Sequence, residues 1–223
     1  MVRRPVVIEL AGPAGAGKTT VWERLTARPQ VVGGSVWHLP RRLYAEAAAR
    51  TLPAIGSLAG AIHWLPREET KQLIRLEALD LFLRRLPEAE RRVVLLDEGP
   101  VFAFAWFRVL GHPCFRNGRR DAWWRRALAH WAARLDVIVL LDASDRLLVH
   151  RLRSREKPHP LKGSSGRDIS AFTAAYRRAF EWVIAGLTAR GGPRVVSLAS
   201  DGAPPEELVE RVLAACEETV HAQ

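Results

Sequence analysis

Short apolar runs and longer amphipathic stretches alternate along this chain of 223 residues. A continuous run of about four to eight apolar residues, many of them β-branched, predicts a strand that is covered on both faces, as in a parallel sheet. Such runs lie at Val6 to Leu10, Ser35 to Leu39, Val93 to Asp97, Val137 to Asp142 and Arg194 to Leu198. The run at Ser35 to Leu39 has the weakest pattern of these.

Between the runs, apolar residues recur at every third or fourth position, which predicts helices with one buried stripe. The stretch from Glu68 to Leu86 shows this best, and further helices are expected at residues 18–28, 121–135, 146–155, 169–188 and 205–218. This alternation predicts one three-layer α/β domain over residues 1–223, with a parallel five-stranded sheet and helices on both faces. Two stretches rich in turn residues, 111–120 and 157–168, are expected to be mobile.

A glycine-rich loop lies between the first expected strand and the helix that follows it. Residues 12–19 match the pattern G-x-x-x-x-G-K-[ST] in full, in the strand–loop–helix setting that the motif requires. Glycines let backbone N–H groups turn toward phosphate oxygens, and the helix N-terminus adds a positive dipole. The loop predicts a nucleoside triphosphate site in which the lysine reaches the β and γ phosphates, the first threonine binds Mg²⁺ and the second bonds to the α-phosphate. The predicted cofactor-binding residues are Gly12, Pro13, Ala14, Gly15, Ala16, Gly17, Lys18, Thr19 and Thr20.

Magnesium needs a carboxylate near this loop, and two of the expected strands end in aspartate. Asp142 leads into a helix that Ser144 or Asp145 could cap, so a structural role suits Asp142 better. Asp97 is followed at once by Glu98 and then by Gly-Pro, which breaks the strand. We assign Asp97 to Mg²⁺, and Glu98 to the general base that takes a proton from the nucleophile. A solvated acid at a strand end is the alternative for Glu98.

A basic helix end follows the fourth expected strand. Arg151 and Arg155 are four residues apart, so they share one helical face, and a loop rich in Gly and Pro comes after them. Guanidinium groups suit the negative charge that spreads over a transferring phosphoryl group. We therefore expect an arginine-rich lid at about residues 151–168 that closes over the nucleotide, with Lys18, Arg151 and Arg155 as catalytic cations. The alternative is a solvated basic helix end that interacts with the helix dipole.

The charge balance adds nucleic acid as a candidate partner, because the net charge is +10 and the isoelectric point is near 10.8. However, no recognition motif accompanies the charge, and the arginines are spread along the chain, so we do not expect nucleic acid as the main partner. An arginine-rich, lysine-poor composition is also typical of GC-rich genomes. No apolar run is long enough to span a bilayer, and the N-terminus lacks the features of a secretory signal. Cys114 and Cys216 match no disulfide or metal pattern, so we expect a cytoplasmic protein without a membrane anchor.

Three stretches of the chain carry a family resemblance. They are Ile8 to Thr20, Leu135 to Ser144 and Arg151 to Lys162. Together they resemble the thymidylate kinase and deoxynucleoside kinase group of P-loop kinases. The resemblance implies a parallel five-stranded sheet, Mg-ATP as phosphoryl donor and a small acceptor bound opposite the nucleotide. It places the acceptor contacts between residues 39 and 86, where the candidates are Arg41, Arg42, Trp64 and Arg75.

One position departs from that group, which usually has an arginine directly after the strand-end acid that Asp97 matches. Here the residue is Glu98. The acceptor therefore stays open: it can be a nucleoside, a nucleotide or another hydroxylated metabolite, such as a sugar. The aromatic run from Val101 to Phe107 is expected in the core, or as the wall of an apolar acceptor pocket.

These features predict an ATP- and Mg²⁺-dependent small-molecule kinase. The main alternative is a P-loop ATPase or GTPase that hydrolyses nucleotide to regulate a partner, because the pair Asp97-Glu98 resembles the acids that activate water in such ATPases. The absence of an Asn-Lys-x-Asp guanine motif and of an ABC signature counts against it. A basic nucleic-acid-associated NTPase rests on charge alone. The oligomeric state stays open, with a homodimer among the options.

Overall fold

The computed structural model of the chain describes residues 4–59, 66–86, 93–116, 121–156, 159–189 and 191–222. The strands are β1 (Val6–Ala11), β2 (Val31–Gly34), β3 (Val93–Asp97), β4 (Val137–Asp142) and β5 (Arg194–Ala199). The helices are α1 (Lys18–Thr26), α2 (Arg41–Ala59), α3 (Arg67–Arg84), α4 (Pro100–Val109), the short 3-10 helix η1 (Pro113–Phe115), α5 (Asp121–Ala132), α6 (Asp145–Ser154), α7 (Gly166–Thr188) and α8 (Pro205–Ala222).

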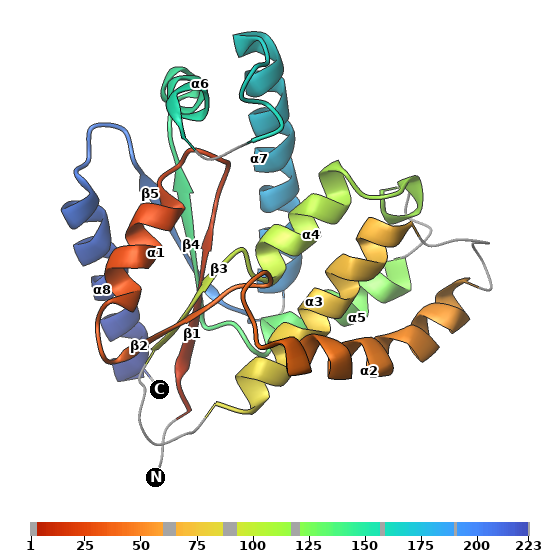
Figure 1. The fold of residues 1–223 in the computed structure, drawn as a ribbon. Helices are drawn as coiled ribbons and strands as arrows, with labels where there is room; N and C mark the ends of the chain where they lie inside the picture. The colour runs from red at the N-terminus through yellow and green to blue at the C-terminus, as the bar shows by residue number, and fades with distance from the viewer. Residues whose placement is uncertain are drawn as a thin grey trace.

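Among the described residues, the strands form one parallel five-stranded sheet in the order β2-β3-β1-β4-β5 (Figure 1). Leu10 of β1 is in register with Asp97 of β3 on one side and with Val139 of β4 on the other. Because the strands are parallel, their carboxyl ends lie at the same edge of the sheet. The loop after β1 therefore lies beside the turn after β3. The predicted parallel α/β fold is confirmed.

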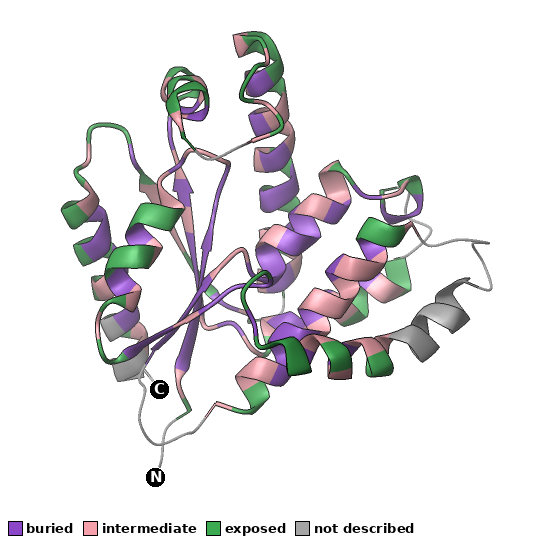
Figure 2. Ribbon diagram, in the orientation of Figure 1, coloured by how far each residue is buried: buried purple, intermediate pink, exposed green. Residues whose placement is uncertain are grey.

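Helices cover the sheet on both faces, because successive strand residues point to opposite sides. On β1, Val6, Ile8 and Leu10 are buried in one core with residues of α1 and α8. Val7 and Ala11 are buried in a second core with residues of α3, α4, α5 and α7. Figure 1 shows these two groups of helices on opposite sides of the sheet, and Figure 2 shows buried positions along the strands and on the facing helix stripes. The chain thus forms the three layers that its sequence predicts.

The second strand lies earlier in the chain than expected. The structure has β2 at Val31–Gly34 and a turn over residues 35–39, so the predicted strand at Ser35 to Leu39 is wrong. The reason is close packing against α1, because a Cβ atom at Gly33 would lie 2.6 Å from the ring of Trp22. Glycine is needed at this position, and a glycine carries no apolar signal in the sequence.

The aromatic run after β3 forms helix α4. The sequence analysis did not predict this helix, because the run shows no alternation of apolar and polar positions at helical spacing. Gly99 is its N-cap and Pro100 its first residue, and proline is favoured at that first helical position. The helix packs against both α3 and α7, so it is apolar on most of its faces. Phe104 and Phe107 are fully buried, and the prediction that this run belongs to the core is confirmed.

Strand β5 and the turn-rich stretches lie at the periphery of the fold. β5 pairs only with β4 among the described strands, and its residues are exposed or half-buried, so it is not covered on both faces as predicted. Residues 117–120 and 157–158 lie outside the described residues, and the mobility of the stretches 111–120 and 157–168 stays a prediction. In the described part of the chain, no helix combines the length and apolarity that crossing a membrane requires.

Candidate active site

The loop between β1 and α1 depends on glycines with left-handed backbone angles. Gly12, Gly15 and Gly17 have φ values of 136°, 89° and 95°. A side chain at Gly12 is excluded by packing as well, because its Cβ would lie 1.9 Å from the carbonyl oxygen of Leu141 on β4. Gly17 is the N-cap of α1, so the loop ends at the free N–H groups of a helix N-terminus. A turned backbone at a helix N-terminus is an anion-binding geometry.

Lys18 is folded over the loop that precedes it. Its Nζ donates hydrogen bonds to the carbonyl oxygens of Gly12 at 2.7 Å and Pro13 at 2.9 Å. Burial lowers the pKa of Lys18, whereas the negative charges of Asp97 and Glu98 act in the opposite direction. The lysine of the loop and the two acids of the turn after β3 therefore lie within electrostatic reach of each other.

The turn after β3 contains a strained acid. Glu98 has a φ of 56°, and no other non-glycine residue in the described ranges has a positive φ. Such an angle costs an L-residue about 1–2 kcal/mol, so the surrounding contacts must enforce it. Burial and the charge of Asp97 raise the pKa of Glu98, while Lys18 and a hydrogen bond from Trp37 lower it. A strained acid with a raised pKa is typical of functional sites.

Glu9 on β1, which the sequence analysis does not single out, supports this turn. Its fully buried carboxylate accepts hydrogen bonds from the backbone N–H groups of Val101 and Phe102, both at 2.9 Å. A Cβ atom at Gly99 would lie 2.8 Å from the carboxyl carbon of Glu9, so a larger residue there would displace this carboxylate. Burial raises the pKa of Glu9 to about 8, although these N–H groups favour the charged form. Its signal in the sequence is one acid inside an otherwise apolar strand.

A stacked cation approaches Glu98 from α3. The guanidinium carbon of Arg75 lies 3.7 Å from the centroid of the Trp37 ring, and Trp37 also hydrogen-bonds to Glu98. Tyr44 of α2 fixes the turn that carries Trp37, since its hydroxyl donates to the carbonyl oxygen of Val36 at 2.9 Å. The segment after β2, the inner side of α3 and the turn after β3 thus meet at Glu98.

Buried polar atoms on α3 are left without a partner beside this cluster. Nη1 of Arg75 and Oε1 of Gln72, one turn apart, have no hydrogen-bond partner among the described residues. Burial lowers the pKa of Arg75. Of the other predicted acceptor contacts, Arg41 and Arg42 are exposed at the start of α2, and Trp64 lies outside the described residues. Arg75 is the acceptor candidate that the structure brings to the site, and Gln72 and Trp37 are residues that the sequence analysis missed.

No protein-family model and no curated protein matches this sequence. Solved structures do match. Shikimate kinase from Bacteroides thetaiotaomicron aligns with a TM-score of 0.52 at 20% identity, over 95% of this chain and 98% of that one. Deoxyadenosine kinase from M. mycoides with bound dATP gives 0.52 at 14% identity, over 95% and 100%. Thymidylate kinase from Candida albicans gives 0.56 at 11% identity, over 97% and 94%. This chain has the fold of the P-loop kinases.

In this P-loop kinase fold, the basic helix that follows β4 is α6, and its arginines have different contacts. Nη1 of Arg151 donates to the carbonyl oxygen of Gly15 at 3.1 Å and to Oγ of Ser200 at 3.0 Å. Arg151 therefore ties the phosphate loop to the segment after β5. Arg155 lies directly after α6, and its charge contributes to the lowered pKa of Lys18, so the two cations are near each other. Closure of a lid over residues 151–168 stays a prediction.

The second strand-end acid has the structural surroundings that the sequence analysis favours. The carboxylate of Asp142 accepts hydrogen bonds from Nε of Arg177 and from the N–H of Ala143, both at 2.7 Å. Arg177 also pairs with Asp145, so α7 is tied to the start of α6. Ser144, one of the two predicted caps, is the N-cap residue of α6, but its side chain makes no capping hydrogen bond.

Oxygen ligands suited to magnesium lie at the adjoining ends of β1 and β3. Thr19 and Thr20 are exposed in the first turn of α1, and Asp97 ends β3. In the described ranges, no group of three or more His, Cys, Asp or Glu side chains could hold a metal ion. This set fits Mg²⁺ in phosphoryl transfer, where one or two protein ligands suffice because phosphate oxygens and water complete the shell.

Proposed function

We propose that this chain is an ATP- and Mg²⁺-dependent kinase that transfers the γ-phosphoryl group to a small acceptor: a nucleoside, a nucleotide or another hydroxylated metabolite. The observation that carries the proposal is the position of Glu98. On one side it interacts with Lys18 of the phosphate loop, and on the other it bonds to Trp37, on which Arg75 stacks. A carboxylate between an anion-binding loop and a stacked cation is suited to act where donor and acceptor meet.

The donor nucleotide would bind along the phosphate loop. The N–H groups of the loop and the positive end of α1 hold the β and γ phosphates, and Nζ of Lys18 exchanges its carbonyl contacts for phosphate oxygens. The Thr19 hydroxyl and Asp97 would hold Mg²⁺, which would neutralise part of the phosphate charge. Arg155 adds positive charge near Lys18, and Arg151 holds the loop from the side of α6.

The proton of the acceptor goes to Glu98. As the acceptor oxygen forms its bond to the γ-phosphorus, the carboxylate takes the hydroxyl proton. The bond between the γ-phosphorus and the bridging oxygen breaks, and ADP leaves with the electron pair. The raised pKa of Glu98 makes it a stronger base than a solvated carboxylate. Lys18 and the arginines of the 151–168 stretch meet the charge on the transferring group.

The acceptor is expected to carry an oxygen-rich group near its reacting hydroxyl. Nη1 of Arg75 lacks an acceptor and Oε1 of Gln72 lacks a donor among the described residues. An unsatisfied buried polar group costs about 1–3 kcal/mol, so a ligand that bonds to both atoms is favoured. A phosphate, carboxylate or ring oxygen would pair with Arg75, and an O–H or N–H group would donate to Gln72.

Transfer of label from γ-labelled ATP tests the function. The panel contains nucleosides, nucleotides, sugars, and aminoglycoside-like and phenolic metabolites, each assayed with Mg²⁺ and with a chelator. A kinase produces labelled acceptor only when Mg²⁺ is present. Brisk release of phosphate into water without transfer to any acceptor would instead support the alternative of a regulatory ATPase.

Substitutions assign the roles within the site. Glu98→Gln keeps the shape of the side chain but removes the base, so kcat should fall about 10²–10⁴-fold while the KM for ATP changes little. Lys18→Ala and Asp97→Asn should abolish turnover. Glu23→Gln, at an exposed position of α1, is the matched control and should keep the wild-type rate. Near-normal turnover of Glu98→Gln would exclude Glu98 as the base.

A single domain, a cytoplasmic location and a homodimer stay predictions from the sequence. Limited proteolysis would show one protected core if residues 1–223 form one domain. Cell fractionation and sedimentation analysis of the purified chain would check the other two.

A further inference from the structure

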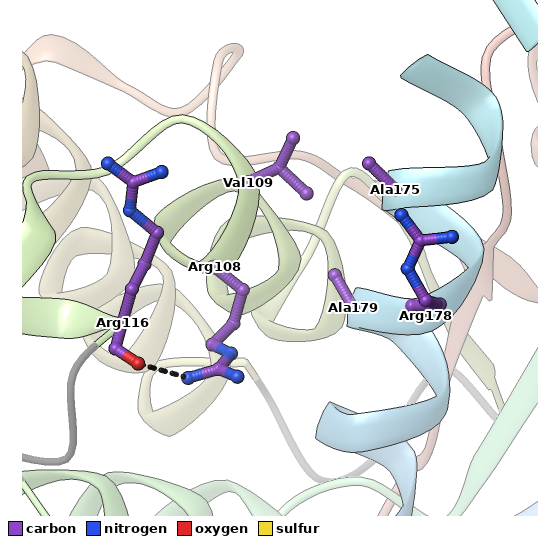
Figure 3. A pocket seen from close by; sticks show the side chains of 6 residues that line it. All are labelled: Arg108, Val109, Arg116, Ala175, Arg178 and Ala179. Atoms are coloured by element: carbon purple, nitrogen blue, oxygen red, sulfur yellow. Dashed lines mark hydrogen bonds between the residues drawn. The ribbon is translucent and has the colours of Figure 1, made fainter. Parts of the chain in front are cut away.

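A cavity lies between α4 and α7. Helix α4 packs between α3 and α7, and the turn with Glu98 lies at its N-terminus. The cavity lies beside the last turn of α4, about 13 Å further along the helix at 1.5 Å per residue. Its volume is about 410 Å³, and it is lined by Arg108, Val109, Arg116, Ala175, Arg178 and Ala179 (Figure 3). It is therefore separated from both the phosphate loop and the α3 side of Glu98.

Half of the side chains that line this cavity are arginines. In the described ranges, no carboxylate forms an ion pair with Arg108, Arg116 or Arg178. Arg177, the residue beside Arg178 in the sequence, differs in this respect because it pairs with Asp142. Positive charges gathered around one space without a counter-ion repel each other, and a bound anion would remove that repulsion.

The central arginine of the cavity is held in place. The guanidinium carbon of Arg108 lies 4.4 Å from the centroid of the Trp182 ring. Its Nη1 donates to the carbonyl oxygen of Arg116 at 3.4 Å. Figure 3 shows the guanidinium groups of Arg116 and Arg178 on opposite sides of the space, and the alanines of α7 leave room between them. The guanidinium of Arg108 is therefore held in place before any ligand binds, which reduces the entropy that it loses on binding.

We propose that this cavity binds a small phosphate-bearing molecule. Planar guanidinium groups donate paired hydrogen bonds that match phosphate oxygens, and arginine is favoured over lysine for such recognition. The cavity volume lies within the range of about 300–1,000 Å³ that small-molecule sites occupy. The site is distinct from the donor and acceptor sites of the proposed kinase, and it does not depend on that proposal.

Thermal unfolding in the presence of inorganic pyrophosphate tests this site. Every protein compared carries Lys18→Ala, which weakens the phosphate loop, and the buffer contains about 0.15 M NaCl to screen general attraction to a basic chain. We expect pyrophosphate to raise the Tm in a saturable way, by about 3–6 °C at about ten times its Kd. The measurement needs no ATP and no turnover, so its outcome is separate from that of the kinase assay.

Paired substitutions locate the effect. Arg116→Gln with Arg178→Gln changes two exposed side chains and relieves their mutual repulsion, so the ligand-free Tm should not fall while the rise with pyrophosphate disappears. Arg24→Gln with Arg211→Gln removes the same charge from α1 and α8 on the other face of the sheet, and this control should keep the full rise. The proposal is overturned if pyrophosphate fails to stabilise the Lys18→Ala protein, or if the rise persists without Arg116 and Arg178.

Discussion

Replacing Glu98 by glycine and, separately, by alanine tests the strained turn at the centre of the candidate site. Its φ of 56° lies in a region that glycine enters freely but that brings the Cβ of any other residue close to a backbone oxygen. Both variants lose the carboxylate and its hydrogen bond to Trp37, so these losses cancel when the two are compared. The remaining difference in stability reports on the backbone.

The expected size of that difference follows from two opposing effects. The left-handed angle costs alanine about 1–2 kcal/mol. Glycine loses about 0.5–1 kcal/mol more conformational entropy than alanine on folding. The glycine variant should therefore be more stable by roughly 0.7 kcal/mol. For a chain of 223 residues this corresponds to a Tm about 1.5–3 °C higher.

Urea unfolding and calorimetry measure the difference, and a helical position supplies the control. Glu23 lies within α1, where glycine should be less stable than alanine by about 0.8–1 kcal/mol. The difference in stability between the glycine and alanine variants should therefore have opposite signs at Glu98 and Glu23. If alanine is the more stable substitute at Glu98 as well, the residue does not hold a left-handed angle and the inference of strain fails. Both Glu98 variants should lose at least as much kinase turnover as Glu98→Gln, because they also lack the base.

Three further substitutions test other parts of the chain. Folding raises the pKa of Glu9 from 4.5 to about 8. The wild type should therefore lose stability as the pH rises from about 4.5 through 8, by up to about 1.4 kcal/mol per pH unit. The urea midpoint of Glu9→Gln should not show this dependence on pH. Asp80→Ala leaves the partly buried Arg134 without its carboxylate and should lower the free energy of unfolding by about 3–5 kcal/mol; a loss below about 1 kcal/mol would show that this ion pair contributes little. Gly12→Ala places a Cβ 1.9 Å from the carbonyl oxygen of Leu141 and should abolish ATP binding in calorimetry, whereas unchanged affinity would contradict the loop geometry.

Strands with a continuous run of buried apolar side chains could be predicted from the sequence. A strand that packs closely through a glycine could not. β3 and β4 have the predicted bounds, because buried parallel strands are continuous apolar runs. β2 was misplaced because Gly33 packs against Trp22, and that contact needs the absence of a side chain. α4 was missed because neighbours on several sides remove the polar stripe by which a helix is recognised.

Some residues of the candidate site could likewise be predicted from the sequence, and others could not. The phosphate loop and Asp97-Glu98 could be predicted because their chemistry resides in consecutive residues with a known spacing. Trp37 could not, because it reaches the site only through the packing of the turn after β2 around Glu98. Gln72 could not, because only the structure shows a buried oxygen without a partner one turn from Arg75. Glu9 could have been noticed, since an acid in a buried strand requires donors that only the folded chain supplies.

The turn after β3 combines features that a purely structural turn would avoid. Its left-handed angle falls on Glu98, whereas the adjacent Gly99 has a φ of −87° and lies against the carboxyl group of Glu9. The glycine of the turn is thus used for packing, and an acidic side chain takes the strained angle that asparagine would tolerate better. Nucleotide binding is already explained by the phosphate loop. A strained, half-buried carboxylate beside Lys18 therefore favours a chemical role for Glu98, namely proton transfer from an acceptor.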